Sequence, residues 1–116
     1  MPVGLEVRTF EQLERLVGAA DLVVPRTVVA ELDRLAADGS GTAARAASVG
    51  RSLAADRCRE IGDAAGSADA SIVGLAAASV VDYVVTNDAA LRHRVLDTGI
   101  PVISLRGRTQ MEIIHP

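Results

Sequence analysis

A chain of 116 residues, 49% of them hydrophobic, can bury the core of one domain, and we expect a single domain over residues 1–116. Its net charge of −3 gives no general attraction for nucleic acid, its lack of lysine excludes a P-loop, and its single Cys58 excludes an internal disulfide. The longest uncharged apolar stretch, Ile72 to Val81, is too short to cross a bilayer, and no secretion signal is recognisable, so we expect a cytoplasmic protein without membrane contact.

Short apolar strands alternate with helices along the first half of the chain. Apolar residues at helical spacing predict a helix over Arg8–Val17, and a β-rich run predicts a strand over Leu22–Pro25. A second helix is expected from Thr27, with an apolar stripe at Val28, Leu32 and Leu35. After a loop at residues 38–41, an Ala/Arg-rich helix is expected over Thr42–Ile61, with a break near Gly50 as an alternative.

The second half of the chain continues the alternation. The expected elements are a turn at Gly62–Ser67, a helix over Asp69–Ser79, a strand over Tyr83–Thr86, a helix over Ala89–Asp97, a strand over Pro101–Leu105, a polar turn at residues 106–108 and a short apolar tail. Strands that alternate with helices predict an α/β fold in which helices cover a parallel sheet. The chain nevertheless opens with a helix, although such folds normally begin with a strand.

Asn87 and Asp88 follow the predicted strand Tyr83–Thr86 directly and precede a helix. In parallel α/β sheets, ligands bind just beyond the carboxyl ends of the strands, so this pair is a candidate metal or phosphate site. Asn and Asp are also preferred helix N-caps, and both interpretations remain open for Asp88.

Two further carboxylates are candidates for the same site. Helical rotation places Asp69 on the apolar face of its helix, where a carboxylate needs a partner, although it could also act as a cap. Glu31 borders the apolar stripe of its helix or is simply solvated. Helix N-termini and strand C-termini share one edge of a parallel sheet, so Glu31, Asp69 and Asp88 can converge there. Converging carboxylates suit Mg²⁺ or Mn²⁺.

Four motifs in order resemble the PIN-domain nucleases. They are Val23-Val24-Pro25 with Glu31-Leu32, then Asp69-Ala70-Ser71-Ile72, then Val85-Thr86-Asn87-Asp88, and finally Gly99-Ile100-Pro101-Val102. The resemblance covers roughly Phe10 to Arg108. Within the family, the chain is similar to the toxin-like and archaeal ribosomal-RNA-processing branches. It implies a three-layer α/β/α fold and metal-dependent cleavage of RNA.

The resemblance also implies roles for individual residues. Glu31, Asp69 and Asp88 would hold Mg²⁺ or Mn²⁺, Asn87 would support the site, and Thr86 would orient a carboxylate or a water molecule. The bound metal would activate water and neutralise phosphoryl charge. A set of arginines is expected to contact RNA phosphates: Arg92, Arg94, Arg106 and Arg108.

One part of the family pattern is missing. PIN domains begin with a strand that ends in Asp-x-Asn, and nothing before Asp21 resembles it. We therefore expect that Met1 is internal and that the natural product starts at least about a dozen residues earlier, enough for one strand. An intact mass equal to that of the 116-residue chain, measured from the native host, would contradict this.

Two classes of function stay open on the sequence. The first is an endoribonuclease, either an RNA-processing enzyme with a partner protein or the toxin of a toxin–antitoxin pair. The second is a catalytically impaired PIN-like scaffold that binds RNA or protein. The carboxylates favour the first class and the missing Asp-x-Asn favours the second. A homodimer is expected from the resemblance in either case.

Overall fold

The computed structural model describes residues 7–63, 65–106 and 110–116, except for the side chains of residues 7–9, 105 and 106. The chain divides into two compact units, Met1–Ala68 and Asp69–Pro116, and each is described by itself. The expectation of a single domain over residues 1–116 stays a prediction. None of the described helices is long and apolar enough to cross a membrane.

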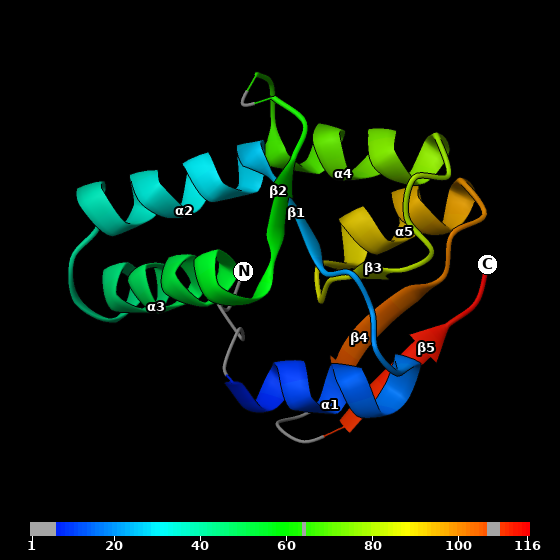
Figure 1. Cartoon of the computed structure of the whole chain (residues 1–116). Helices are drawn as coiled ribbons and strands as arrows, with labels where there is room; N and C mark the ends of the chain where they lie inside the picture. The colour runs from blue at the N-terminus through cyan, green and yellow to red at the C-terminus, as the bar shows by residue number, and fades with distance from the viewer. Residues whose placement is uncertain (1–6, 64, 107–109) are drawn as a thin grey trace. The chain divides into compact units, whose positions relative to one another are not determined.

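The first unit combines three helices with a small parallel sheet. Its elements are α1 (Val7–Val17), β1 (Val23–Pro25), α2 (Arg26–Asp38), α3 (Gly41–Arg57) and β2 (Arg59–Ile61). Strand β1 runs parallel to β2, with Val23 opposite Arg59 and Pro25 opposite Ile61. Helices α2 and α3 lie side by side, joined by a tight loop (Figure 1). The predicted helix, strand and helix over residues 8–38 are thus confirmed.

Small residues on one face let α3 pack closely against α2. Ala47, Gly50 and Ala54 recur at helical spacing and are all buried. The alternative of a break at Gly50 is therefore wrong: packing outweighs the roughly 1 kcal/mol that an internal glycine costs a helix. An ion pair between Arg51 Nε and Asp33 Oδ1, 3.0 Å apart, also joins α3 to α2.

The buried face of α2 differs from the expected stripe. Thr27, Val29 and Leu32 are buried, whereas Leu35 is 38% exposed. Only Leu32 of the expected stripe is fully enclosed, because the face that packs in the folded unit is rotated from the one that the apolar spacing indicates.

The helix predicted over Thr42–Ile61 is too long at its C-terminus. It ends at Arg57, and Arg59 begins β2, where its backbone N–H donates to the Leu22 carbonyl at 2.8 Å. Arg59 also pairs with Asp21 at 2.6 Å, which lowers the pKa of that carboxyl through the hydrogen bond. Cys58, between the two elements, is half-buried, and burial raises the pKa of its thiol. Pairing with a distant strand therefore overrides the local helical pattern.

The second unit is a three-stranded sheet with two helices. Its elements are α4 (Ala68–Ala77), β3 (Val84–Val85), α5 (Ala89–Asp97), β4 (Val102–Arg106) and β5 (Gln110–Ile114). The strand order is β3-β4-β5; β4 is parallel to β3 and antiparallel to β5. The prediction of a mere apolar tail is wrong, because residues 110–114 form β5 with Ile114 opposite Val102.

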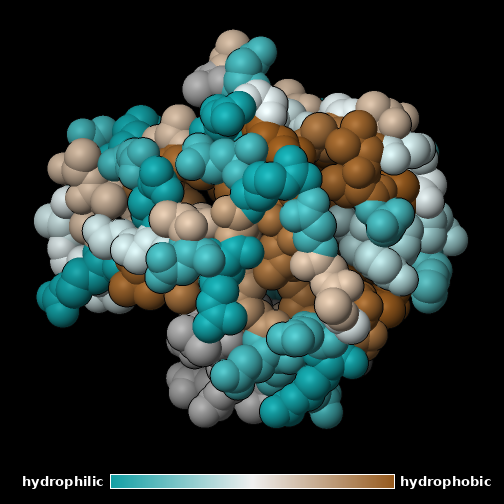
Figure 2. Space-filling view, in the orientation of Figure 1, coloured by the Kyte–Doolittle hydropathy of each residue, from teal (hydrophilic) through white to brown (hydrophobic). Residues whose placement is uncertain are grey.

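One apolar core holds this unit together. Ala76 of α4, Val84 of β3, Leu91 and Val95 of α5, and Val102 of β4 are buried in a single cluster. Figure 2 shows that apolar surface remains over α4, whose sequence is apolar around most of its circumference. Val80, which follows α4, is 61% exposed. Because residues of α4, α5, β3 and β4 share this buried cluster, the core fixes where the two helices lie on the two strands.

Leu91→Ala is expected to lower the free energy of unfolding by about 2–5 kcal/mol, because it opens a cavity in this core. Val80→Ala is the control and should change it by less than about 0.5 kcal/mol, since Val80 is mostly exposed. Urea unfolding followed by circular dichroism measures both. Equal effects of the two substitutions would contradict the assignment of Leu91 to the core.

Candidate functional site

The junction between β3 and α5 positions Asp88. Its Oδ1 accepts a hydrogen bond from the Leu91 backbone N–H at 3.0 Å, so Asp88 is the N-cap of α5. Its own N–H donates to Thr86 Oγ1 at 3.1 Å. The capping interpretation is therefore confirmed. Because the described bonds of the carboxylate involve Oδ1, capping is compatible with a ligand bound through the other oxygen.

Two hydrogen bonds, one to its backbone N–H and one to its carbonyl, hold Thr86 at the end of β3. Its N–H donates to the Ile103 carbonyl at 3.1 Å, and its carbonyl accepts from Ser104 Oγ at 2.8 Å. Ser104 is buried in β4, and we had not singled it out from the sequence. The available signal was a lone hydroxyl in the apolar run 101–105, which needs a partner once it is buried. This anchor fixes the residue that leads into Asn87 and Asp88.

Asp69 lies in the first turn of α4 and is exposed. The prediction that it shares the buried face is wrong. Because α4 is apolar on nearly all sides, its pattern defines no single face, and a first-turn residue extends beyond the packed part of the helix. Within the described part of the chain, Asp69 has no hydrogen bond or ion pair to another residue, so its carboxylate is available to a ligand.

Asp69 and Asp88 belong to the same end of the second unit. Helices α4 and α5 both begin at the side of the sheet where β3 ends (Figure 1). Exposed Asn87 lies between Thr86 and Asp88 at that end. Both carboxylates also precede or occupy a first helical turn, where the helix dipole favours negative charge. The topology of the unit thus puts Asp69, Asn87 and Asp88 at the end where β3 finishes, and their assembly into one site stays a prediction.

Glu31 belongs to the other unit, and its convergence with Asp69 and Asp88 stays a prediction. It lies on α2 beside buried Leu32 and forms an ion pair with Arg34 one turn later. Arg34 Nε donates to Glu31 Oε2 at 3.2 Å, and Arg34 Nη2 bonds Oε1. The Glu31 hydrogen bond raises the pKa of the Arg34 guanidinium. One alternative for Glu31 was a solvated residue at the border of the apolar stripe. Its side chain is indeed partly exposed, but it is paired with Arg34.

The donor atoms of the candidate residues fit a hard divalent cation in kind, since carboxylate and amide oxygens are what Mg²⁺ and Mn²⁺ prefer. Across residues 7–63, 65–106 and 110–116, however, no three acidic, histidine or cysteine side chains form a group that could hold a metal ion. The three-carboxylate metal site therefore remains an expectation from the sequence.

The predicted phosphate-binding arginines divide into two pairs. Arg92 and Arg94 lie on α5, four and six residues after Asp88. Arg92 is partly buried and Arg94 is exposed, and neither forms an ion pair with another described residue. The side chain of Arg106 and all of Arg108 lie outside the described residues. The roles of all four stay predictions.

Asp88→Ala is expected to destabilise the protein by about 1 kcal/mol, because it leaves the Leu91 N–H without its acceptor. Asp88→Asn should cost much less, since Asn caps about as well as Asp. Thermal unfolding of both variants measures the difference. Equal losses of stability in Asp88→Ala and Asp88→Asn would contradict a stabilising role for the N-cap hydrogen bond.

Comparison with known proteins identifies the fold and the family. A family model described as a PIN-like domain matches residues 1–108, whereas no curated protein gives a significant match. Among solved structures, the PIN domain endonuclease Utp24 superimposes with a TM-score of 0.73 at 23% identity, over 93% of this chain and 78% of that one. This likeness confirms the predicted PIN-like α/β fold with parallel strands. Since the family match spans most of the sequence, the chain belongs to the PIN-like domain family.

Proposed function

We propose that the protein is a metal-dependent endoribonuclease that hydrolyses RNA phosphodiester bonds. The observation that carries the proposal is the placement of Asp69, Asn87 and Asp88 at the carboxyl end of β3 in a chain of the PIN-like family. Three oxygen-bearing side chains at that end of a parallel strand pair lie where α/β folds bind ligands.

In this proposal, Asp69 and Asp88 hold Mg²⁺ or Mn²⁺, with Glu31 as a third carboxylate ligand. The ion, when bound, supplies an activated water and neutralises charge on the phosphoryl oxygens. Asn87 supports the ligands through its amide. Thr86 acts through the backbone, because its hydroxyl accepts from the Asp88 N–H and thereby fixes the direction in which the carboxylate leaves the strand.

The N-cap bond prepares Asp88 for this role. A carboxylate whose Oδ1 is bound to the Leu91 N–H has lost most of its rotamer freedom before a ligand arrives. A site built on such a fixed group loses less entropy on binding than one built on a mobile side chain. Capping and metal binding are therefore complementary uses of the same residue.

RNA is the proposed substrate, and α5 is the proposed place for its backbone. Arg92 and Arg94 follow Asp88 on the same helix and have no carboxylate partner among the described residues. Guanidinium groups bind phosphates bidentately. Two residues apart on a helix, Arg92 and Arg94 point to different sides of α5, so each can hold a different phosphate. Arg106 and Arg108 are proposed for the same role.

A scaffold that binds RNA or protein without cleaving it is the second candidate. It is favoured by the ion pair in which Arg34 bonds both carboxylate oxygens of Glu31. A partner protein, either an antitoxin or an RNA-processing factor, and homodimer formation stay proposals under both functions.

The cleavage assay uses end-labelled single-stranded RNA with Mn²⁺. Asp69→Asn and Asp88→Asn should each lower the rate at least about 100-fold, because loss of even an outer-shell group commonly costs 10–100-fold. EDTA should abolish cleavage. Asp97→Asn is the matched control, since it removes an exposed carboxylate from the opposite end of α5 and should leave the rate unchanged.

Each outcome of this assay selects a function. Loss of cleavage in both site variants, with normal unfolding temperatures, supports the nuclease. RNA binding without cleavage by the unmodified chain favours the scaffold. Cleavage that persists in Asp88→Asn and in EDTA would contradict the metal-dependent proposal and point to a contaminating ribonuclease.

The salt dependence of RNA binding tests the role of α5. Arg92→Gln and Arg94→Gln should each reduce the slope of log K against log salt by about 0.7, the value for one phosphate contact on a single strand. Arg45→Gln, an exposed arginine of α3, is the control and should leave the slope unchanged. Fluorescence anisotropy with a labelled oligonucleotide provides the constants. Unchanged slopes in all variants would remove α5 from the RNA-binding surface.

A further inference from the structure

The N-terminus of α2 has hydrogen-bond donors that no side chain caps. The N-cap position is Pro25, whose side chain has no oxygen, and no acidic residue occupies the first turn. Because the first amides of a helix have no acceptor within it, the N–H groups of Thr27 and Val28 lack the kind of partner that Asp88 provides for α5. This end of α2 therefore favours an acceptor with negative charge.

The hydroxyl of Thr27 is a second, independent feature of the same place. Thr27 is only 4% exposed, and its buried Oγ1 has no hydrogen-bond partner in the described part of the chain. Buried polar atoms are nearly always hydrogen-bonded, so an unpaired one indicates room for a ligand. Every Cα–Cβ bond of a helix tilts toward the N-terminus, which directs this hydroxyl toward the end where the free amides lie.

Arg26 adds positive charge beside these donors. Its Nη1 donates to the carbonyl of Gly62, the residue after β2, and among the described residues it forms no ion pair. A guanidinium has several further N–H donors that remain for a ligand. Because the Arg26 side chain is exposed, it can leave the Gly62 carbonyl and admit a ligand to the enclosed hydroxyl.

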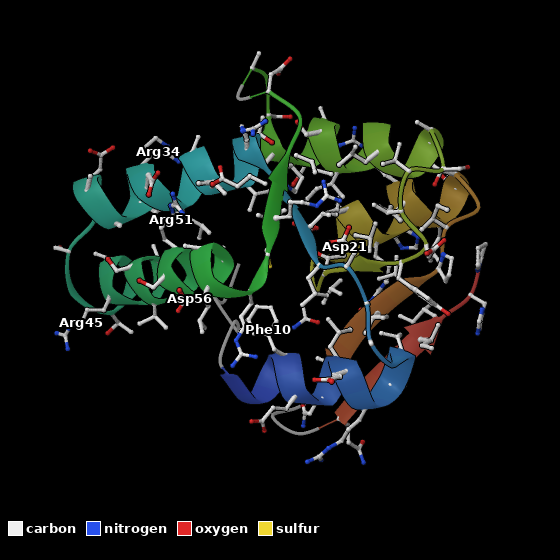
Figure 3. The ribbon with its side chains drawn as sticks, in the orientation of Figure 1. Phe10, Asp21, Arg34, Arg45, Arg51 and Asp56 are labelled. Atoms are coloured by element: carbon white, nitrogen blue, oxygen red, sulfur yellow. The ribbon has the colours of Figure 1, made fainter. Side chains whose placement is uncertain are left out.

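The acidic residues around β1 and β2 have other partners or lie in solvent. Asp21, labelled in Figure 3, precedes β1 at the opposite end of the strand pair and forms an ion pair with Arg59 at 2.6 Å. Asp63 Oδ1 accepts from the Ala65 N–H at 3.0 Å. Glu60 of β2 is exposed, so solvent and salt screen its charge.

These donors lie where two parallel strands end and a helix begins. Pro25 opposite Ile61 is the last pair of β1 and β2, and α2 begins at the next residue (Figure 1). Ligands of α/β folds bind beyond the carboxyl ends of parallel strands, and helix N-termini hold phosphates. We propose that the N-terminus of α2 is a phosphate-binding site, in which the Thr27 hydroxyl, the Thr27 and Val28 amides and the Arg26 guanidinium hold phosphate oxygens.

The site lies within the first unit and needs neither a metal ion nor the proposed cleavage reaction. A phosphate oxygen fits it better than a neutral acceptor, because charged oxygens form the stronger hydrogen bonds with N–H and O–H donors. The enclosure of Thr27 Oγ1 strengthens the bond further, since water is kept away from it.

The test titrates the full chain with inorganic phosphate and follows the backbone amides by ¹H–¹⁵N NMR. The signals of Thr27 and Val28 should shift with phosphate but not with chloride at equal ionic strength. Thr27→Val should weaken binding at least about ten-fold, the effect of losing one hydrogen bond to a charged group, and Thr27→Ser should retain it. Thr42→Val is the matched control, because Thr42 is also the second residue of a helix, α3, but is exposed.

Two further comparisons separate ligand binding from a structural role. Arg26→Gln should weaken phosphate binding, whereas Arg45→Gln, an exposed arginine of α3 labelled in Figure 3, should not. Without phosphate, Thr27→Val should leave the Tm unchanged or raise it, because a methyl group replaces an unpaired buried hydroxyl. A lower Tm of Thr27→Val together with unchanged phosphate affinity would overturn the proposal.

Short single-stranded DNA with a 5′-hydroxyl or a 5′-phosphate identifies the source of the phosphate. Shifts of the Thr27 and Val28 amides with both oligonucleotides, lost in Thr27→Val, assign the site to backbone phosphates. Shifts with the 5′-phosphorylated form alone assign it to a terminal phosphate, and shifts with inorganic phosphate alone assign it to the free ion. Each of these results supports the proposal. Absence of a shift at these amides with every probe would overturn it, and RNA cleavage by the same protein would leave the proposed function intact.

Discussion

The parallel pairing of β3 with β4 is the constraint on which the candidate site depends. It places Thr86 at the end of a strand whose backbone is bonded to Ile103 and Ser104, and the chain must then turn into α5. The first amides of a helix need acceptors, so the residue that makes this turn needs a side-chain oxygen. Asp88 supplies it. A negative charge is thereby fixed at the edge of the sheet by folding itself, before any ligand is involved.

Packing then brings a second carboxylate to the same end. Ala76 of α4 and Leu91 of α5 share one apolar core with β3 and β4, so both helices are held against the same strands. Since α4 runs opposite to β3, its N-terminus and Asp69 come to the end where β3 finishes. Apolar burial therefore determines where the two carboxylates lie, and a cavity in that core weakens the site without removing either carboxylate.

Local chemistry and the parallel sheet were predictable from the sequence, whereas the pairing of strands β2 and β5 was not. The cap at Asp88 follows from residue type and position after an apolar strand. Strand β2 lay inside an Ala/Arg-rich helical pattern, and only its pairing with β1 ends α3 at Arg57. Strand β5 likewise depends on β4. Asp69 was misplaced because an almost wholly apolar helix carries no information about which side is buried. The Glu31–Arg34 pair was readable from its i, i+3 spacing.

The proposed ligands share one property: each carboxylate is stabilised by its own helix. Asp88 accepts from the Leu91 amide, Glu31 from Arg34, and Asp69 lies in the first turn of α4, where the helix dipole attracts negative charge. Such local partners lower the free energy of each carboxylate in its charged form. The three partners differ in what a ligand must displace: nothing at Asp69, nothing at the second oxygen of Asp88, and a guanidinium at Glu31.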